Sequence, residues 1–172
     1  QLEPIDHARV ARDIDVLLCG YAYPSRKKFV DALLPLLGGV KTVLCGDGWE
    51  DREGVETMPT QDIASTQTLH ARAKTVICLH RTGGDCSDGP VAPESVCRGF
   101  MEGFFGPRVF LDRARAKHPF DDGDVVWYSS PADLAKRLKE YLAGGRDAAA
   151  DRFAEKCATL YTYRARLARV LN

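Results

Sequence analysis

The amino-acid sequence predicts an α/β domain in which a parallel sheet carries helices on both faces. Short apolar runs of strand length alternate with longer segments of helical periodicity along the 172 residues. These runs are continuous rather than alternating in polarity, as expected of parallel strands that are buried on both sides. A chain of this length buries about 70% of its unfolded surface, so it forms one domain without disulfide support.

Six apolar runs are predicted to form the strands. They cover residues 15–19, 42–45, 55–58, 75–79, 109–111 and 125–128. Two of them end alike, in Leu-Leu-Cys-Gly at Gly20 and in Val-Leu-Cys-Gly at Gly46. Glycine at a strand end permits either a sharp turn or the close approach of a ligand to the backbone. Both interpretations stay open for these two residues.

The first two helices are predicted between the early strands. Ser25 precedes a segment with one apolar stripe, which consists of Phe29, Leu33, Leu36 and Leu37. Pro35 must kink this helix or end it early, because proline has no backbone N–H and clashes with the preceding turn. Thr60 is predicted to cap the second helix, which runs toward Ala73.

The later helices are predicted from their end signals. Proline opens a third helix over residues 93–105. The helix over residues 131–142 has Ser130 as N-cap, Asp133 at the capping-box position and a glycine pair at 144–145 as its stop. Two further helices are expected at the C-terminus, and the inner face of the first consists of Phe153, Cys157, Leu160 and Tyr161.

Composition excludes several function classes. The 24 Lys and Arg residues balance 24 Asp and Glu, so the chain lacks the basic charge of a general nucleic-acid or anionic-membrane binder. No apolar run approaches the roughly 18 residues that span a bilayer, and the first 15 residues are too polar for a signal peptide. We therefore expect a cytoplasmic protein. The cysteines have no zinc spacing, and Cys19, Cys45 and Cys78 are expected to be small buried residues.

The common nucleotide and hydrolase motifs are missing. The sequence has no Gly-x-Gly-x-x-Gly after its first strand, no phosphate loop ending in Gly-Lys-Ser/Thr and no Gly-x-Ser-x-Gly elbow. Hydride transfer and nucleotide hydrolysis therefore lose most of their support.

A pair of acidic residues gives the first functional signal. Glu94 and Glu102 are eight residues apart, which places them two turns apart on broadly the same side of one helix, with Arg98 between them. Carboxylates accept hydrogen bonds from sugar hydroxyls, while arginine and a helix N-terminus neutralise phosphate. The alternative is that Glu94 and Arg98 form an ordinary surface pair at i,i+4.

Three cations open the first helix. Arg26, Lys27 and Lys28 lie at the end where the helix dipole favours anions. In open parallel sheets the ligand crevice lies at the carboxyl ends of the strands. A locally unfavourable choice beside that crevice suggests a phosphate shared by these cations and the helix amides. The alternative for Lys27 and Lys28 is plain surface charge.

Other candidates have structural alternatives that we prefer. Asp121, Asp122 and Asp124 could mimic a metal-binding cluster, but they stand in a turn before a strand. Another candidate is His80, which we expect to be a loop residue rather than a donor contact. Two aromatic residues, Trp49 and Tyr21, could stack on a base, although aromatic residues at loop starts more often pack.

A longer set of motifs resembles a known family. The motifs are Asp15-Val-Leu-Leu-Cys-Gly20, Arg26, Gly46-Asp-Gly-Trp49, Ala73-Lys74-Thr-Val-Ile-Cys-Leu79, Arg98 with Glu102, Trp127-Tyr-Ser-Ser-Pro131, Leu142 and Thr162-Tyr-Arg-Ala-Arg166. In this order they resemble the C-terminal half of glycosyltransferases with two facing Rossmann-like domains, known as the GT-B fold. The bacterial group related to spore-maturation glycosyltransferases is the most similar.

The resemblance implies a Rossmann-like open parallel sheet that binds a nucleoside-diphosphate sugar. Residues 15–172 would form this donor domain, and residues 1–14 an N-terminal extension or linker. By position, Glu94 would contact the transferred sugar as the catalytic residue, and Glu102 would hold the nucleotide ribose. Arg26 would face the diphosphate, with Arg98 as a further donor-binding residue, and Gly20 would permit close approach.

The resemblance also implies transfer with retention of anomeric configuration, without a divalent metal or a separate cofactor. The resemblance places the acceptor-binding half outside these 172 residues, so an N-terminal domain or a second chain would supply it. The loop at residues 103–107 is bulkier than in the family, and Arg98 and Glu102 are four rather than three apart. The alternative is therefore a non-catalytic Rossmann-like module for binding or scaffolding. A flavodoxin-like or receiver-like module is disfavoured. Receiver domains need acids at the ends of the first strands, whereas Asp47, Glu50 and Asp51 follow the second strand only, and the C-terminal helix pair beyond Leu142 exceeds that fold.

Overall fold

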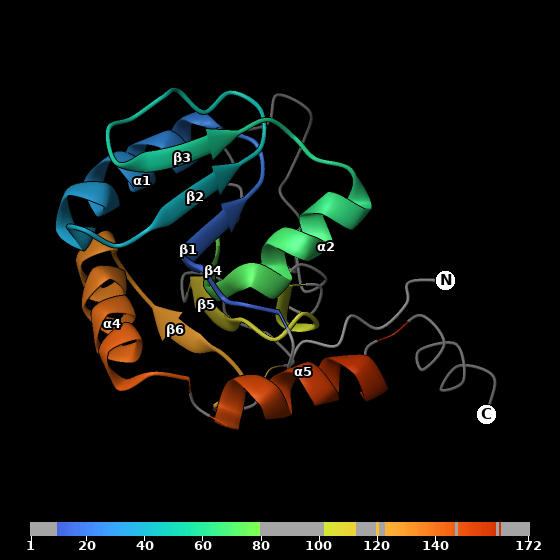
Figure 1. Ribbon diagram of the computed structural model, residues 1–172. Coiled ribbons are helices and arrows are strands. Elements are labelled where there is room, and N and C mark those ends of the chain that lie inside the picture. The colour runs from blue at the N-terminus through green and yellow to red at the C-terminus, as the bar shows by residue number, and fades with distance from the viewer. Residues whose placement is uncertain are drawn as a thin grey trace, which may run out of the picture.

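The computed structural model describes residues 10–79, 102–112, 120, 123–146, 148–160 and 162. Its centre is a sheet of six strands in the order β3-β2-β1-β4-β5-β6 (Figure 1). The strands are β1 (Ile14–Cys19), β2 (Thr42–Cys45), β3 (Val55–Met58), β4 (Ala73–Cys78), β5 (Arg108–Asp112) and β6 (Val126–Tyr128). All neighbouring strands pair in parallel. The fold is thus a Rossmann-like open α/β sheet, and its strand order reverses between β1 and β4.

Every predicted strand is present, and the bounds differ by one or two residues. The strand β1 begins at Ile14, β4 ends at Cys78 rather than Leu79, and β6 begins at Val126 rather than Val125. The strand β4 begins at Ala73 and includes the exposed Lys74, while β5 begins at Arg108 rather than Val109. Arg108 is nevertheless buried, because its guanidinium donates to the carbonyl oxygens of Gly123 and Asp124 at 2.7 and 3.1 Å. A hydrophobic pattern does not register a charged residue whose partners are backbone carbonyls elsewhere in the chain.

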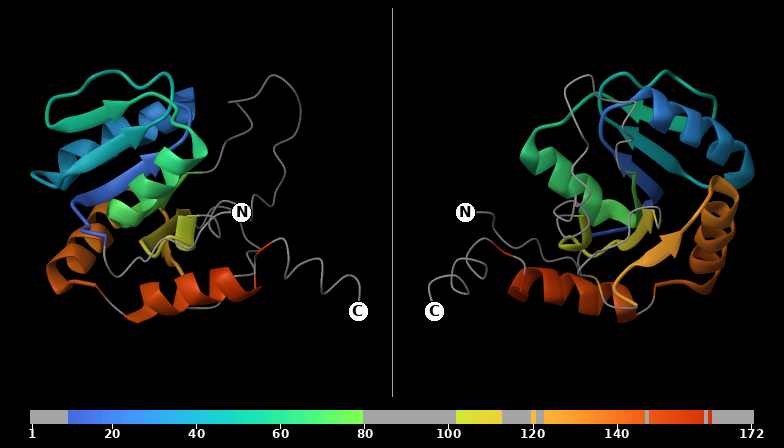
Figure 2. Two further views of the ribbon diagram at one scale, coloured as in Figure 1. Left: turned by 45° about the vertical axis from the view of Figure 1, so that its right-hand side comes forward. Right: turned by 180° about the vertical axis from the view of Figure 1, so that it is seen from behind.

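Helices cover both faces of the sheet, as Figures 1 and 2 show. They are α1 (Pro24–Leu37), α2 (Ile63–Arg72), α4 (Pro131–Gly144) and α5 (Ala148–Leu160). On one face, α1 and α4 bury Leu33 and Leu138 in a cluster that includes Val16 of β1. On the other face, Leu69 of α2 packs beside Leu17 of β1, while α5 contributes to a separate cluster under β4 and β5.

The first two helices differ in detail from their predictions. The helix α1 continues to Leu37, so Pro35 lies within its last turn. The helix α2 is capped by Asp62 rather than Thr60, because the Asp62 carboxylate accepts from the Ser65 N–H at 2.8 Å. Thr60 lies outside the helix, where its N–H donates to the Asp47 carboxylate at 2.9 Å.

The apolar stripes are also partly corrected. In α1, Leu36 is 41% exposed, whereas Val30, which the predicted stripe omitted, is buried. In α5, Phe153 and Cys157 are buried as predicted, but Leu160 is 37% exposed at the end of the helix. Tyr161 and the second C-terminal helix lie outside the described residues, as do positions 93–101 of the predicted third helix.

The start of α4 confirms its sequence signals. The Ser130 hydroxyl accepts from the Asp133 N–H at 3.1 Å, and the Asp133 carboxylate accepts from the Ser129 N–H at 3.0 Å. The helix ends at Gly144, and Gly145 follows it with φ of 79°. Within the described part of the chain, no helix has the length and apolar character that a membrane span requires.

Candidate functional site

The two glycines at the ends of β1 and β2 form a close backbone contact. A Cβ atom at Gly46 would lie 2.4 Å from the Gly20 carbonyl oxygen. Both residues have positive φ, 135° at Gly20 and 139° at Gly46, where side chains are unfavourable. The Gly20 N–H donates to the Cys45 carbonyl oxygen at 2.7 Å, and the Gly46 N–H donates to the Met58 carbonyl oxygen at 2.9 Å. Backbone packing therefore requires glycine at position 46, while a ligand contact at Gly20 stays a prediction.

Two cysteines precede these glycines as register partners in β1 and β2. Cys19 and Cys45 are buried, which confirms the expectation from sequence. A hydrogen bond from Cys19 lowers the pKa of Cys45 to about 7. The apolar pattern did not predict this polar pairing beside the glycine contact.

The Arg26 side chain lies at the point where the strand order reverses, between the segments that follow β1 and β4. The residue belongs to the first turn of α1 and is only 5% exposed. Its guanidinium donates to the carbonyl oxygen of Leu79, just after β4, at 2.7 Å and to that of Tyr21 at 3.0 Å. Lys27 instead forms a surface ion pair with Glu50. Of the three cations at this helix start, Arg26 is therefore the one that the fold directs inward.

Glu102 lies at the carboxyl end of the same central strand. Its side chain is buried, and Oε2 accepts a hydrogen bond from the thiol of Cys78, the last residue of β4. The next residue, Gly103, is packed so tightly that a Cβ atom there would lie 2.3 Å from the ring of Phe153. The carboxylate and the backbone beside it are thus both fixed, one by β4 and the other by α5.

Tyr128 is a member of this edge that the sequence analysis did not select. It is the last residue of β6, and its hydroxyl donates to the Cys78 carbonyl oxygen at 3.0 Å. Burial raises the pKa of Tyr128 well above its ordinary value, the charges of Asp112 and Glu102 raise it further, and Arg26 opposes them. Arg26 of α1, Asp112 of β5 and Glu102 therefore lie close enough to Tyr128 to change its pKa.

The chain also matches a known protein family. A family model described as glycosyl transferase-like matches residues 26–172, which is most of the chain. The chain belongs to this glycosyl transferase-like family. The matched range begins at Arg26 and includes Glu102. A comparison with curated protein sequences gives no match.

Several other predicted site residues of this glycosyltransferase domain lie outside the part of the chain that the structure describes. Glu94, Arg98 and His80 lie outside the described residues, as do Asp121 and Asp122. The structure therefore brings Arg26 and Glu102 to the end of β4 and does not place the predicted catalytic Glu94.

Three further candidates from the sequence are described by the structure. Trp49 and Asp124 have structural contacts, and Tyr21 is exposed. The Trp49 indole N–H donates to the Gly20 carbonyl oxygen at 2.9 Å, and its ring packs against the core. Tyr21 is 49% exposed in the loop after β1. Asp124 pairs with Lys156 of α5 at 2.6 Å, so it supports the docking of a helix.

Replacing Arg26 by Lys should lower the free energy of unfolding of the glycosyltransferase domain by about 1–3 kcal/mol. Lysine keeps the charge but cannot present two donors in a planar fork to Leu79 and Tyr21. Urea denaturation measures this loss. Lys28→Ala, at an exposed position of the same helix turn, is the control and should change stability by less than about 0.5 kcal/mol. Equal effects of the two substitutions would contradict a bridging role for Arg26.

Proposed function

We propose that this glycosyltransferase domain binds a nucleoside-diphosphate sugar at the carboxyl edge of its sheet and takes part in transfer of the sugar to an acceptor hydroxyl. The observation that carries the proposal is the Glu102 carboxylate, held beside Cys78 at the end of β4. In open α/β sheets, ligands bind outside the carboxyl ends of the strands, at the point where the strand order reverses. That point lies between β1 and β4 in this sheet.

The chemistry of Glu102 suits a ribose. A carboxylate accepts hydrogen bonds only, and a thiol such as that of Cys78 is a weak donor. The hydroxyl groups of a ribose are stronger donors than a thiol, and a carboxylate accepts charge-assisted hydrogen bonds from them. Glu102 is therefore proposed to hold the nucleotide ribose.

The leaving diphosphate requires positive charge. We assign this role to Arg26, whose two carbonyl partners hold the guanidinium between the loop after β1 and the end of β4. A fixed cation stabilises the charge that develops on a departing phosphate, because no reorganisation is needed during the reaction. Gly20 would permit close approach of the donor, and Arg98 would add a second cation.

The transfer step is proposed by position alone. Glu94 would contact the transferred sugar, and the reaction would proceed with retention and without a divalent metal. An acceptor-binding domain or a second chain would supply the acceptor hydroxyl. The domain alone should then bind donor but transfer sugar slowly or not at all.

Replacing Glu102 by Gln tests the donor site. Wild-type protein should bind uridine or guanosine diphosphate in a calorimetric titration, and E102Q should bind about 10- to 100-fold more weakly. The expected loss corresponds to a charge-assisted hydrogen bond of about 1.5–3 kcal/mol. Glu140→Gln, on the exposed side of α4, makes the same chemical change away from the site and should leave affinity unaltered.

Two outcomes would count against the proposal. Equal affinity of E102Q and wild type, with unchanged circular dichroism, would remove Glu102 from the donor site. Failure of the folded wild-type domain to bind any nucleotide would favour the alternative, a non-catalytic Rossmann-like module for binding or scaffolding.

A further inference from the structure

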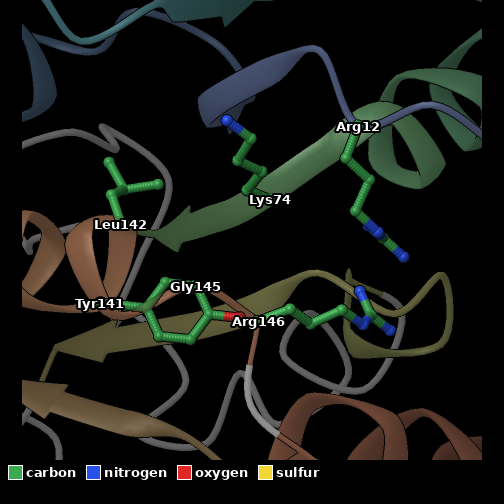
Figure 3. Close-up of a pocket in the computed structure, with 6 residues that line it drawn as sticks. All are labelled: Arg12, Lys74, Tyr141, Leu142, Gly145 and Arg146. Atoms are coloured by element: carbon green, nitrogen blue, oxygen red, sulfur yellow. The ribbon is translucent and has the colours of Figure 1, made fainter.

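A cavity with three cationic side chains in its lining lies at the amino end of the parallel strands, away from the Glu102 carboxylate. It has a volume of about 230 Å³. The described residues that line it are Arg12, Lys74, Tyr141, Leu142, Gly145 and Arg146 (Figure 3). Lys74 is the second residue of β4, and Gly145 follows the C-terminal end of α4, so the cavity belongs to the amino end of the parallel strands.

The cations around this cavity are not fully paired. Lys74 forms an ion pair with Asp15 at 2.6 Å, and Arg146 forms one with Asp151. Arg12 donates instead to two carbonyl oxygens, those of Ala73 and Phe105, and no carboxylate of the described chain forms an ion pair with it. The three cations of the lining therefore exceed these two carboxylates by one positive charge, and the charge of Asp151 also acts on Arg12.

Two guanidinium groups meet at one point of the cavity wall. A Cβ atom at Gly106 would lie 2.8 Å from Nη2 of Arg12 and 3.4 Å from Nη2 of Arg146. Figure 3 shows the two arginine side chains extending toward the same space, whereas Lys74 turns away from it. Burial, followed by the charge of Arg146, lowers the pKa of Arg12 to about 10. These like charges repel each other, and the Asp151 carboxylate, which pairs with Arg146 and raises the pKa of Arg12, offsets part of this repulsion.

The donors at the cavity select an anion. Each guanidinium has five N–H donors. Two of those on Arg12 are used by Ala73 and Phe105, and three of those on Arg146 are used by Asp151 and Gly106, so three and two remain. Tyr141 adds a hydroxyl, which Figure 3 shows on the side of Arg146. The volume is below the 300–1,000 Å³ typical of sites for larger ligands, so a phosphate group fits and a whole nucleotide does not.

We propose that Arg12, Arg146 and Tyr141 form a binding site for a phosphate-sized anion, either free phosphate or the phosphate group of a small monoester. Guanidinium groups bind phosphate through paired N–H donors, and the surplus charge of Arg12 supplies the attraction. This site is separate from the proposed donor site, because it lies at the amino rather than the carboxyl end of β4.

Titration of the 172-residue chain with inorganic phosphate tests this proposal. Amide chemical shifts of Ala73, Gly106 and Arg146 should move with saturation, and affinity should fall at least 10-fold in Arg12→Ala. Arg12→Lys should retain part of the affinity. Lys139→Ala removes one charge from an exposed position on α4 and should leave phosphate binding unchanged. A parallel titration with glucose 6-phosphate distinguishes free phosphate from a monoester as the preferred ligand.

Several results would overturn the proposal. One is the absence of saturable shifts at these amides, and another is an equal loss of affinity in the Arg12 and Lys139 variants. If R12A unfolds, the phosphate affinity of R12K is compared with that of wild type instead, and the expected result is a partial loss. Uridine diphosphate binding should be the same in wild type and R12K, so failure of the anion site and failure of the donor site give different results.

Discussion

Phe153→Ala is expected to lower the free energy of unfolding by about 3–5 kcal/mol, the range typical of a buried phenylalanine. Phe153 is 1% exposed and is the main apolar contact of α5 with the sheet. Its ring stacks edge-on against Phe120, with centroids 5.6 Å apart, and fills the space beside Gly103. Truncation would leave a cavity that these rigid neighbours cannot close. The midpoint of urea denaturation measures the loss.

Leu160→Ala is the matched control for this substitution. Leu160 belongs to the same helix but is 37% exposed, so its truncation should cost less than about 1 kcal/mol. Comparable losses in the two variants would show that α5 is not docked through Phe153. F153A should also weaken nucleotide binding, because Gly103 would lose the ring that fixes the backbone beside Glu102.

The strands were predictable because each is a continuous apolar run buried on both sides. Val43 and Leu44 of β2 are adjacent in sequence, belong to opposite clusters, and are each at most 1% exposed. The helix starts were less predictable. Both Thr60 and Asp62 can cap a helix by residue type, and the selection of Asp62 depends on Thr60 being held by Asp47 from the loop after β2.

The candidate site was predictable where a residue was locally unfavourable. A cation at a helix start indicated Arg26, and the structure gives the reason, since its partner Leu79 is 53 residues away in sequence. The sequence did not indicate a polar contact for Tyr128, because an aromatic residue at the end of an apolar run is consistent with simple packing. Its contact with Cys78 depends on the spatial order of β4, β5 and β6, which local periodicity does not encode.

Gly46→Ala is expected to lower the free energy of unfolding by about 2–6 kcal/mol. Two costs add at this position. A side chain at φ of 139° introduces backbone strain of about 1–3 kcal/mol, and the new methyl group would lie 2.4 Å from the Gly20 carbonyl oxygen. The clash adds an overpacking cost of about 1–3 kcal/mol. Chemical denaturation measures the total.

Substitutions at two other glycines distinguish the cost of backbone strain from the cost of the clash. Gly54→Ala has positive φ but open space around the new Cβ atom, so it carries the strain alone. Gly144→Ala lies at the end of α4 with neither strain nor clash, and should be neutral or up to about 1 kcal/mol stabilising. If G46A costs no more than G54A, the ends of β1 and β2 can move apart without penalty. If G46A costs more, the contact between Gly20 and Gly46 is rigid, and the carboxyl edge of the sheet is held in shape before any ligand binds.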